Sequence, residues 1–309
     1  MSLLHRAGIP RDLVQLVPGA GKVGAALTMH PLIAGVAFTG STDTARRINR
    51  GLADRPGAII PLIAETGGQN VMIVDSSALP EQVTRDVVAS SFQSAGQRCS
   101  ALRLLFVQDD VADTMLTMIE GAMKALSIGD PRLLTTDVGP VIDAEAKAAL
   151  DAHLADLAQR GQILARLDAP AATGHFVSPA MAQIASLADL DREHFGPILH
   201  IIRWKSGELD QVIAAINASG YGLTLGLQSR IDTTRVHVER HARVGNLYVN
   251  RNQIGAVVES QPFGGEGLSG TGPKAGGPHY VARFATERVT CIDTTAAGGN
   301  ASLMAAIEG

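Results

Sequence analysis

The sequence has only two cysteines, Cys99 and Cys291, among its 309 residues. Secreted scaffolds held by disulfides carry more cysteines, usually in clusters, so this composition predicts a reducing, cytoplasmic setting. Long apolar runs are missing as well, because no stretch reaches the roughly 18 residues that a membrane-spanning helix needs. We therefore expect no transmembrane segment.

An excess of charge of one sign is also missing. The chain has 30 acidic and 26 basic residues, and its formal net charge is -4. Proteins that bind nucleic acid usually show a basic excess, so no nucleic-acid partner is expected. The nine histidines lack ligand spacing: His237 and His241 lie four apart, but Glu239 does not stand where zinc-protease motifs need it. No metal site is predicted.

The chain instead contains alternating β-rich runs and helical patterns, which favour a parallel α/β fold of about two domains. We predict strands at residues 12–17, 35–39, 59–65, 71–75, 102–107, 198–203 and 246–250. We predict helices at residues 23–30, after residues 40–42, and at 83–94, 112–126 and 144–160. The segment 263–278 is dense in glycine and is predicted to be a loop that presents backbone donors.

The two cysteines lie in different local settings. Cys99 ends the run GQRC in a turn between a predicted helix and a predicted strand, where sulfur can reach a cleft and a nearby cation can favour the thiolate. Cys291 lies in an apparent strand at residues 288–293 and is predicted to be packed as a small apolar residue. A catalytic Cys99 should therefore alkylate faster than Cys291.

Residues 19–24 (GAGKVG) have the spacing of a dinucleotide-binding glycine motif. The acidic residue expected after the next strand is absent, because residues 38–41 (FTGS) stand there, so a tight turn is favoured over that motif. Ser41 and Thr42, at a predicted helix start, are better placed to bind a pyrophosphate. Their other possible role is to cap the helix, and both roles can coexist.

Five motifs then occur in order along the chain. They are residues 38–42 (FTGST), 65–70 (ETGGQN), 96–99 (GQRC), 193–197 (EHFGP) and 262–265 (PFGG). Together they resemble the signatures of the aldehyde dehydrogenase superfamily, and the resemblance covers nearly the whole chain.

This resemblance implies an α/β fold with an aldehyde dehydrogenase-like catalytic domain and a truncated Rossmann-like nucleotide domain. It implies a partial NAD-binding domain at residues 1–65 and a catalytic domain at 66–261. A substrate-anchor loop and a C-terminal oligomerisation segment would follow at 262–309. One departure is Ala45, where many superfamily members have glycine.

A narrower resemblance is to the L-glutamate γ-semialdehyde (Δ1-pyrroline-5-carboxylate) dehydrogenase domain of bifunctional proline utilization A proteins. Residues 264–280 (GGEGLSGTGPKAGGPHY), Ser100 and residues 294–304 carry it. It implies NAD-dependent oxidation of glutamate γ-semialdehyde to L-glutamate, the second step of proline catabolism. It also implies a proline dehydrogenase domain in the parent chain and a homo-oligomer.

The resemblance also assigns the site residues. Cys99 would be the nucleophile and Glu65 the base that activates water for thioester hydrolysis. The cofactor-binding residues would be Gly40 and Ser41 at the pyrophosphate, Glu193 at the ribose next to nicotinamide, and Phe195 at the nicotinamide end.

The substrate-binding residues would be Ser100, Ser269 and Gly270. Successive backbone N–H groups of the glycine-rich loop could hold the α-carboxylate, with Ser269 adding a hydroxyl donor. A subunit-contact role for this loop is the alternative.

Complete family members carry a long segment before the region where this chain starts, including an asparagine that helps hold the oxyanion. Such a donor is typically worth roughly a hundred- to a thousand-fold in rate. We therefore expect this chain alone to be weakly active or inactive. A non-catalytic assembly module that retains the family motifs is the rival interpretation.

Overall fold

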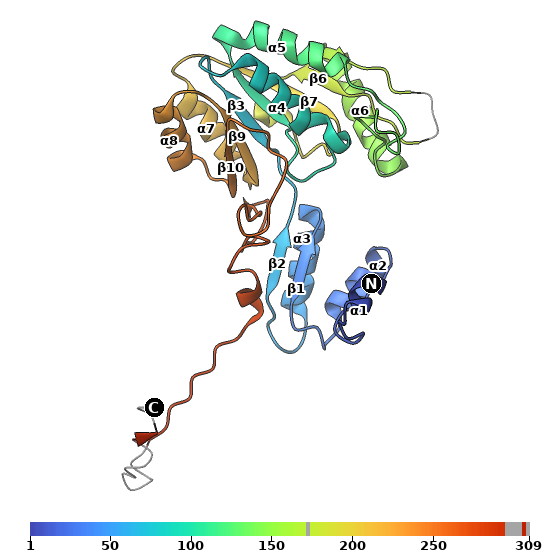
Figure 1. Cartoon of the computed structure of the whole chain (residues 1–309), viewed down its shortest axis with the longest axis vertical. Coiled ribbons are helices and arrows are strands. Elements are labelled where there is room, and N and C mark those ends of the chain that lie inside the picture. The colour runs from blue at the N-terminus through green and yellow to red at the C-terminus, as the bar shows by residue number, and fades with distance from the viewer. Residues whose placement is uncertain (171–173, 294–304, 307–309) are drawn as a thin grey trace.

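The computed structural model describes residues 1–170, 174–293 and 305–306. Figure 1 shows a large body built on one sheet, a smaller two-stranded sheet with the N-terminal helices beside it, and a final segment that runs away from the body. The helices are α1 Ser2–Arg6, α2 Gly21–Met29, α3 Thr42–Asp54, α4 Pro80–Phe92, α5 Asp109–Lys124, α6 Ala144–Gln159, α7 Leu209–Ala218 and α8 Asp232–His241. Short 3-10 turns lie at Gln93–Gly96, Leu187–Asp189 and Val281–Phe284.

The strands of the large body form a seven-stranded sheet in the order β10-β9-β3-β4-β7-β6-β5. Its members are β3 Val71–Val74, β4 Leu104–Gln108, β5 Ile163–Arg166, β6 Ala180–Gln183, β7 Ile198–Trp204, β9 Thr224–Gln228 and β10 Asn246–Val249. All neighbours pair in parallel except β5 with β6. Every residue of β3 and β4 is buried, which explains why both strands are apolar except for Gln108 at the end of β4.

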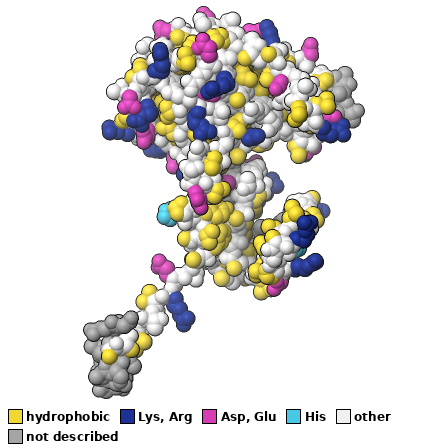
Figure 2. Space-filling view, in the orientation of Figure 1, with side chains coloured by type: hydrophobic (Ala, Val, Ile, Leu, Met, Phe, Trp, Pro, Cys, Tyr) yellow, Lys and Arg dark blue, Asp and Glu magenta, His cyan; other side chains and the backbone are white. Residues whose placement is uncertain are grey.

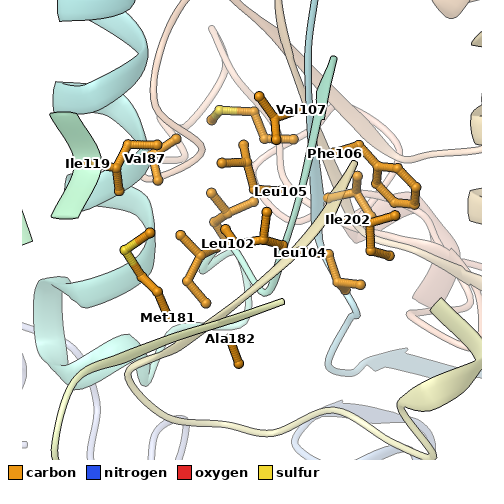
Figure 3. Close-up of a cluster of buried hydrophobic side chains, with 14 of the residues drawn as sticks. Val87, Leu102, Leu104, Leu105, Phe106, Val107, Ile119, Met181, Ala182 and Ile202 are labelled. Atoms are coloured by element: carbon orange, nitrogen blue, oxygen red, sulfur yellow. The ribbon is translucent and has the colours of Figure 1, made fainter. Parts of the chain in front are cut away.

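The core of the body lies against this sheet. Val87 of α4 and Ile119 of α5 lie on one side of the strand residues, near Leu105 and Met181 (Figure 3). All four side chains are at most 1% exposed. The sheet, with α4 and α5 packed together beside it, therefore forms a rigid support for the loops at its ends.

The smaller sheet contains β1 Val36–Thr39 and β2 Leu62–Glu65, paired in parallel. Its register sets Thr39 opposite Glu65, and the Gly40 N–H donates to the Glu65 carbonyl at 3.1 Å. The turn after β1 is thus held beside the end of β2. A third sheet pairs β8 Tyr221–Gly222 with β11 Glu266–Gly267 and fastens the glycine-rich loop to the large body.

Two strand predictions are wrong. Residues 12–17 form a turn followed by unpaired chain, and residues 288–293 carry no strand either. Both are apolar or β-rich runs that pair with no neighbouring strand among the described residues, and both are open to solvent: Leu13 is 72% exposed and Val289 is 91% exposed. Cys291, predicted to be packed, is therefore exposed.

The other predicted elements are confirmed within a few residues, including the helix after residues 40–42 and the strand that ends at Glu65. In the predicted glycine motif, α2 begins at Gly21 inside the run. The Ser41 hydroxyl accepts from the Thr44 N–H and caps α3, as proposed for one of its two roles. The segment 294–304, which carried part of the narrower resemblance, lies outside the described residues.

Candidate active site

Cys99 lies in a tightly built loop between α4 and β4. Gly96 has a φ of +65°, and a side chain there would meet the Gly196 carbonyl oxygen at 2.3 Å, so only glycine fits. The Asn70 amide donates to the Cys99 carbonyl at 2.6 Å and to the Ala101 carbonyl at 2.8 Å. These contacts fix the backbone that carries the thiol.

The pKa of the Cys99 thiol is raised by burial. The backbone N–H of Ser100 lowers this pKa, and the carboxylates of Glu193 and Glu65 raise it further. The sequence indicated that a nearby cation can favour the thiolate; the guanidinium of Arg98 donates to the Ser94 hydroxyl instead, and Arg103 is the cation that interacts with Cys99. Cys99 is thus a thiol that needs a base. Cys291 is exposed, so the prediction that Cys99 alkylates faster than Cys291 no longer follows.

Glu65 ends β2 and is 8% exposed. Burial raises the pKa of its carboxyl to about 7, while the Gly265 N–H and the ammonium of Lys274 act in the opposite direction. The Gly265 N–H donates to Oε2 at 3.1 Å, and buried Oε1 has no hydrogen-bond partner. A carboxyl with a pKa near neutrality and a free acceptor oxygen suits a general base that activates a water molecule.

Glu193 faces a buried arginine that the sequence analysis missed. Arg103 is 1% exposed, and its guanidinium lies 3.1 Å from Glu193 Oε1. It also donates to the carbonyls of Gly96, Arg98 and Gly196, so one side chain joins the cysteine loop to the EHFGP loop. The sequence feature that could have revealed this pairing is an arginine inside an otherwise apolar predicted strand, because a buried charge requires a partner.

Burial raises the pKa of Glu193, while Arg103 and the backbone N–H of Gly68 lower it. A side chain at Gly67 would lie 1.7 Å from Glu193 Oε2, so this glycine makes room for the carboxylate. Glycine in the ETGGQN motif therefore has a steric role in the structure.

A cavity of about 1080 Å³ joins the cysteine loop, the EHFGP loop and the start of α3, whereas Glu65 is not among the residues that line it. It is lined from the small sheet by Gly40 and Ser41, and from the large body by Cys99, Glu193 and Phe195. All five are predicted site residues, and the structure brings them together around one space. The start of α3 opens on this cavity, where backbone N–H groups and the helix dipole can hold a phosphate group. These residues fit a dinucleotide.

The three predicted substrate residues are placed differently, and none of them lines the cavity. Ser269 is fully buried, and its hydroxyl accepts from the Gly222 N–H at 3.1 Å. Ser100 is 6% exposed, and its carbonyl accepts from the Thr224 hydroxyl. Gly270 pairs with Glu65, where a side chain would come within 3.1 Å of the carboxylate.

Behind Glu193 lies a cluster of three histidines that the sequence analysis also missed. His153 stacks on His194 with ring centroids 3.4 Å apart, and its Nε2 lies 2.9 Å from that of His200. Burial lowers the pKa of His194 to about 4 and that of His200 to about 3, with His153 adding to both shifts. The three imidazole rings are therefore uncharged at neutral pH and serve to pack the interior. Over the described residues, no group of three or more histidine, cysteine or acidic side chains is arranged to hold a metal ion.

The sequence profile of the Aldehyde dehydrogenase family matches residues 1–290, so the chain belongs to this family. It is 54% identical over 299 residues to the bifunctional protein PutA of Salmonella typhimurium, covering 93% of this chain and 23% of that protein. It is 38% identical to a 1-pyrroline-5-carboxylate dehydrogenase of Bacillus cereus, covering 94% of this chain and 57% of that protein. The chain thus spans about a quarter of the bifunctional relatives and little more than half of the shorter ones.

Solved structures of related proteins share the fold of this chain. A crystal structure of bifunctional proline utilization A superposes with a TM-score of 0.91 at 59% identity, over 96% of this chain and 30% of that one. A 1-pyrroline-5-carboxylate dehydrogenase from Thermus with bound NAD gives a TM-score of 0.87 at 33% identity, over 92% of this chain and 55% of that one. The predicted resemblance and fold class are confirmed. Among the described helices, none has the length and apolarity to cross a bilayer.

Proposed function

We propose that the protein carrying this chain oxidises L-glutamate γ-semialdehyde to L-glutamate. The observation that carries the proposal is one cavity that brings together Cys99, the start of α3 and the EHFGP loop, with Glu65 close enough to act electrostatically on the thiol. The substrate is supported by the names of the relatives, which include 1-pyrroline-5-carboxylate dehydrogenases.

In the proposed reaction, Cys99 loses its proton to a base, and its sulfur bonds to the aldehyde carbon to give a tetrahedral thiohemiacetal. Glu65 is the candidate base, because its pKa of about 7 leaves it partly ionised at neutral pH. A bound NAD would supply the hydride acceptor, so that loss of hydride from this carbon would give the thioester.

The thioester is then cleaved by water. Glu65, after passing the Cys99 proton to solvent, takes a proton from the water molecule as the water oxygen bonds to the acyl carbon, and the carbon–sulfur bond breaks to release glutamate and the Cys99 thiolate. Oε1 of Glu65, which lacks a partner, is the acceptor available for that water.

The cofactor would be held by residues of this chain. Gly40 and Ser41 would bind the pyrophosphate at the start of α3, Glu193 the ribose next to nicotinamide, and Phe195 the nicotinamide end. Phe195 lines the cavity and is 43% exposed, so its ring is available to a ligand. Arg103 and Gly67 would keep Glu193 in place for this contact.

The glycine-rich loop is our proposed anchor for the substrate α-carboxylate, with Ser100, Ser269 and Gly270. Its position beside Glu65 supports the proposal. The Ser269 hydroxyl already accepts a hydrogen bond from the Gly222 N–H, so Ser269→Ala also removes a structural contact. The KM of this variant must therefore be measured with two substrates. A rise in KM for glutamate semialdehyde alone would support the carboxylate contact, whereas equal losses for propanal would indicate only a structural role.

We further propose the division into residues 1–65, 66–261 and 262–309, a homo-oligomeric parent protein with a proline dehydrogenase domain, and a reducing, cytoplasmic setting. The first boundary is supported by the position of Glu65, which ends β2 just before the chain enters the large sheet. Two free cysteines support the setting.

The experiment compares NADH formation from glutamate semialdehyde and from propanal by three proteins: this chain, an upstream-extended form, and the extended Cys99→Ala variant. We expect selective turnover of glutamate semialdehyde by the extended form, its loss in the variant, and weak or no turnover by this chain. If the extended form is silent with both aldehydes, the non-catalytic assembly module becomes the better interpretation.

A further inference from the structure

Lys274 belongs to the glycine-rich loop but makes its hydrogen bonds across the molecule. Its ammonium group donates to the carbonyl of Gly245, to the carbonyl of Gly264 at 2.8 Å, and to the Asn246 side-chain oxygen at 3.4 Å. Gly245 and Asn246 lie at the start of β10, at the edge of the large sheet. A single lysine therefore fastens the loop to the sheet.

The backbone that Lys274 holds is the backbone that contacts Glu65. The Gly265 N–H donates to Glu65 Oε2 at 3.1 Å, and a side chain at Gly264 would lie 2.6 Å from Oε1. The Gly264 N–H itself donates to the Asn246 side chain at 3.2 Å. Gly264 and Gly265 are thus held between Lys274 and Asn246 on one side and the Glu65 carboxylate on the other.

Lys274 also acts on Glu65 through its charge. Burial raises the pKa of Glu65 to about 7, and the positive charge of Lys274 is one of the two effects that limit this rise. Burial lowers the pKa of Lys274 itself, while the carboxylates of Glu65 and Glu266 oppose that shift. The Cys99 thiol is a further titratable group on which the Glu65 carboxylate acts, and the Glu193 carboxylate acts on it as well.

We propose that Lys274 is a positioning residue for Glu65: its hydrogen bonds hold the Gly264–Gly265 backbone against the carboxylate, and its ammonium group places a positive charge on that side of the carboxylate. This rests on the proposed role of Glu65 as the base. Without the ammonium, the Gly265 N–H still opposes the effect of burial but that positive charge does not, so a smaller fraction of Glu65 is available to take a proton.

The test uses the extended protein with Lys274→Met, which removes the charge, and Lys274→Arg, which keeps it. Lys205→Met is the matched control, since Lys205 is an exposed lysine that follows β7. The first readout is an infrared pH titration of the Glu65 carboxyl, identified by the band that Glu65→Gln removes. It reports on Glu65 even if the protein turns over no aldehyde, so failure of the proposed function and failure of this inference are distinguishable.

We expect Lys274→Met to raise the titration midpoint of Glu65 by about one unit, the low end of the effect of a nearby opposite charge. Lys274→Arg and Lys205→Met should leave it within a few tenths of a unit of the parent. A midpoint in Lys274→Met equal to that of the parent, or equal shifts in Lys274→Met and Lys274→Arg, would overturn the proposal.

The second readout is the pH profile of thioester hydrolysis in single turnover. A rise of about one unit from a pKa near 7 leaves roughly a tenth of Glu65 ionised at neutral pH instead of about half, so hydrolysis in Lys274→Met should be about fivefold slower there. The loss should disappear about two units higher. A loss of equal size at every pH would show that Lys274 serves only to hold the fold.

Discussion

The large body and the N-terminal region, residues 1–61, differ in what holds them together. In the body, β3 and β4 are wholly buried and α4 and α5 cover them. In the N-terminal region, neither α1 nor α2 buries a residue, and Leu16 and Leu32 are 70% and 85% exposed. Figure 2 shows hydrophobic side chains gathered on this smaller part of the molecule.

Both regions nevertheless contribute to the same cavity. Gly40 and Ser41 come from the region with little core, whereas Cys99 and Glu193 come from the region with a complete one. The comparison teaches that Cys99, the proposed nucleophile, is supported by an extensive buried core, while the proposed cofactor turn depends on few buried contacts. Regions with few buried apolar contacts open more easily, so the two halves of the site should differ in local stability.

The largest expected effect concerns the two cores directly. Leu105→Ala removes a fully buried side chain of β4 and should lower the free energy of unfolding by about 3 kcal/mol. Leu16→Ala, at an exposed position, should change it by less than about 0.5 kcal/mol. Urea unfolding followed by circular dichroism measures both. Similar losses for the two variants would mean that residues 1–61 share the core of the body.

A pH effect of intermediate size should appear only in the body. His200 has a pKa of about 3 in the fold against an ordinary value of 6.5, so the unfolded chain binds the extra proton as the pH falls below 6.5. Its contribution to stability is therefore complete above that value and declines by about 2 kcal/mol by about pH 5.

Replacing His200 with asparagine should make this decline smaller but not abolish it, because His194, with a pKa of about 4, contributes a loss of the same sign. Urea midpoints at about pH 7 and about pH 5 give the slope for parent and variant. An unchanged slope would mean that His200 is not the group whose protonation destabilises the body.

The smallest expected effect compares two helix caps. Ser41 caps α3 of the N-terminal region and Asp143 caps α6 of the body, each by accepting from a backbone N–H. Asp143→Ala should lower the stability of the body by about 1 kcal/mol, whereas Ser41→Ala should speed amide exchange in α3 without shifting the main unfolding transition. Equal shifts of that transition by both variants would remove the distinction between the regions.

Local patterns predicted much of the fold. The runs that became β1, β2, β3, β4, β7 and β10 were found because apolar residues and flanking turns mark them. The short strand β9 was missed: Gly226 interrupts it, and the missing side chain there lets Met72 approach. Residues 12–17 look like a strand but are not one, because a strand needs a partner that the run itself does not specify.

The sequence by itself predicted the family and the candidate site residues, since Cys99, Glu65, Gly40, Ser41, Glu193 and Phe195 lie in motifs whose order resembles that of the family. Only the tertiary structure decided how those residues behave. The buried pairing of Arg103 with Glu193 joins residues 90 apart in the chain, and the hydrogen bond that Glu65 accepts from Gly265 joins residues 200 apart. Desolvation and charge pairing depend on which distant segments pack together, so the near-neutral pKa of Glu65 and the burial of Ser269 could not be read from local sequence.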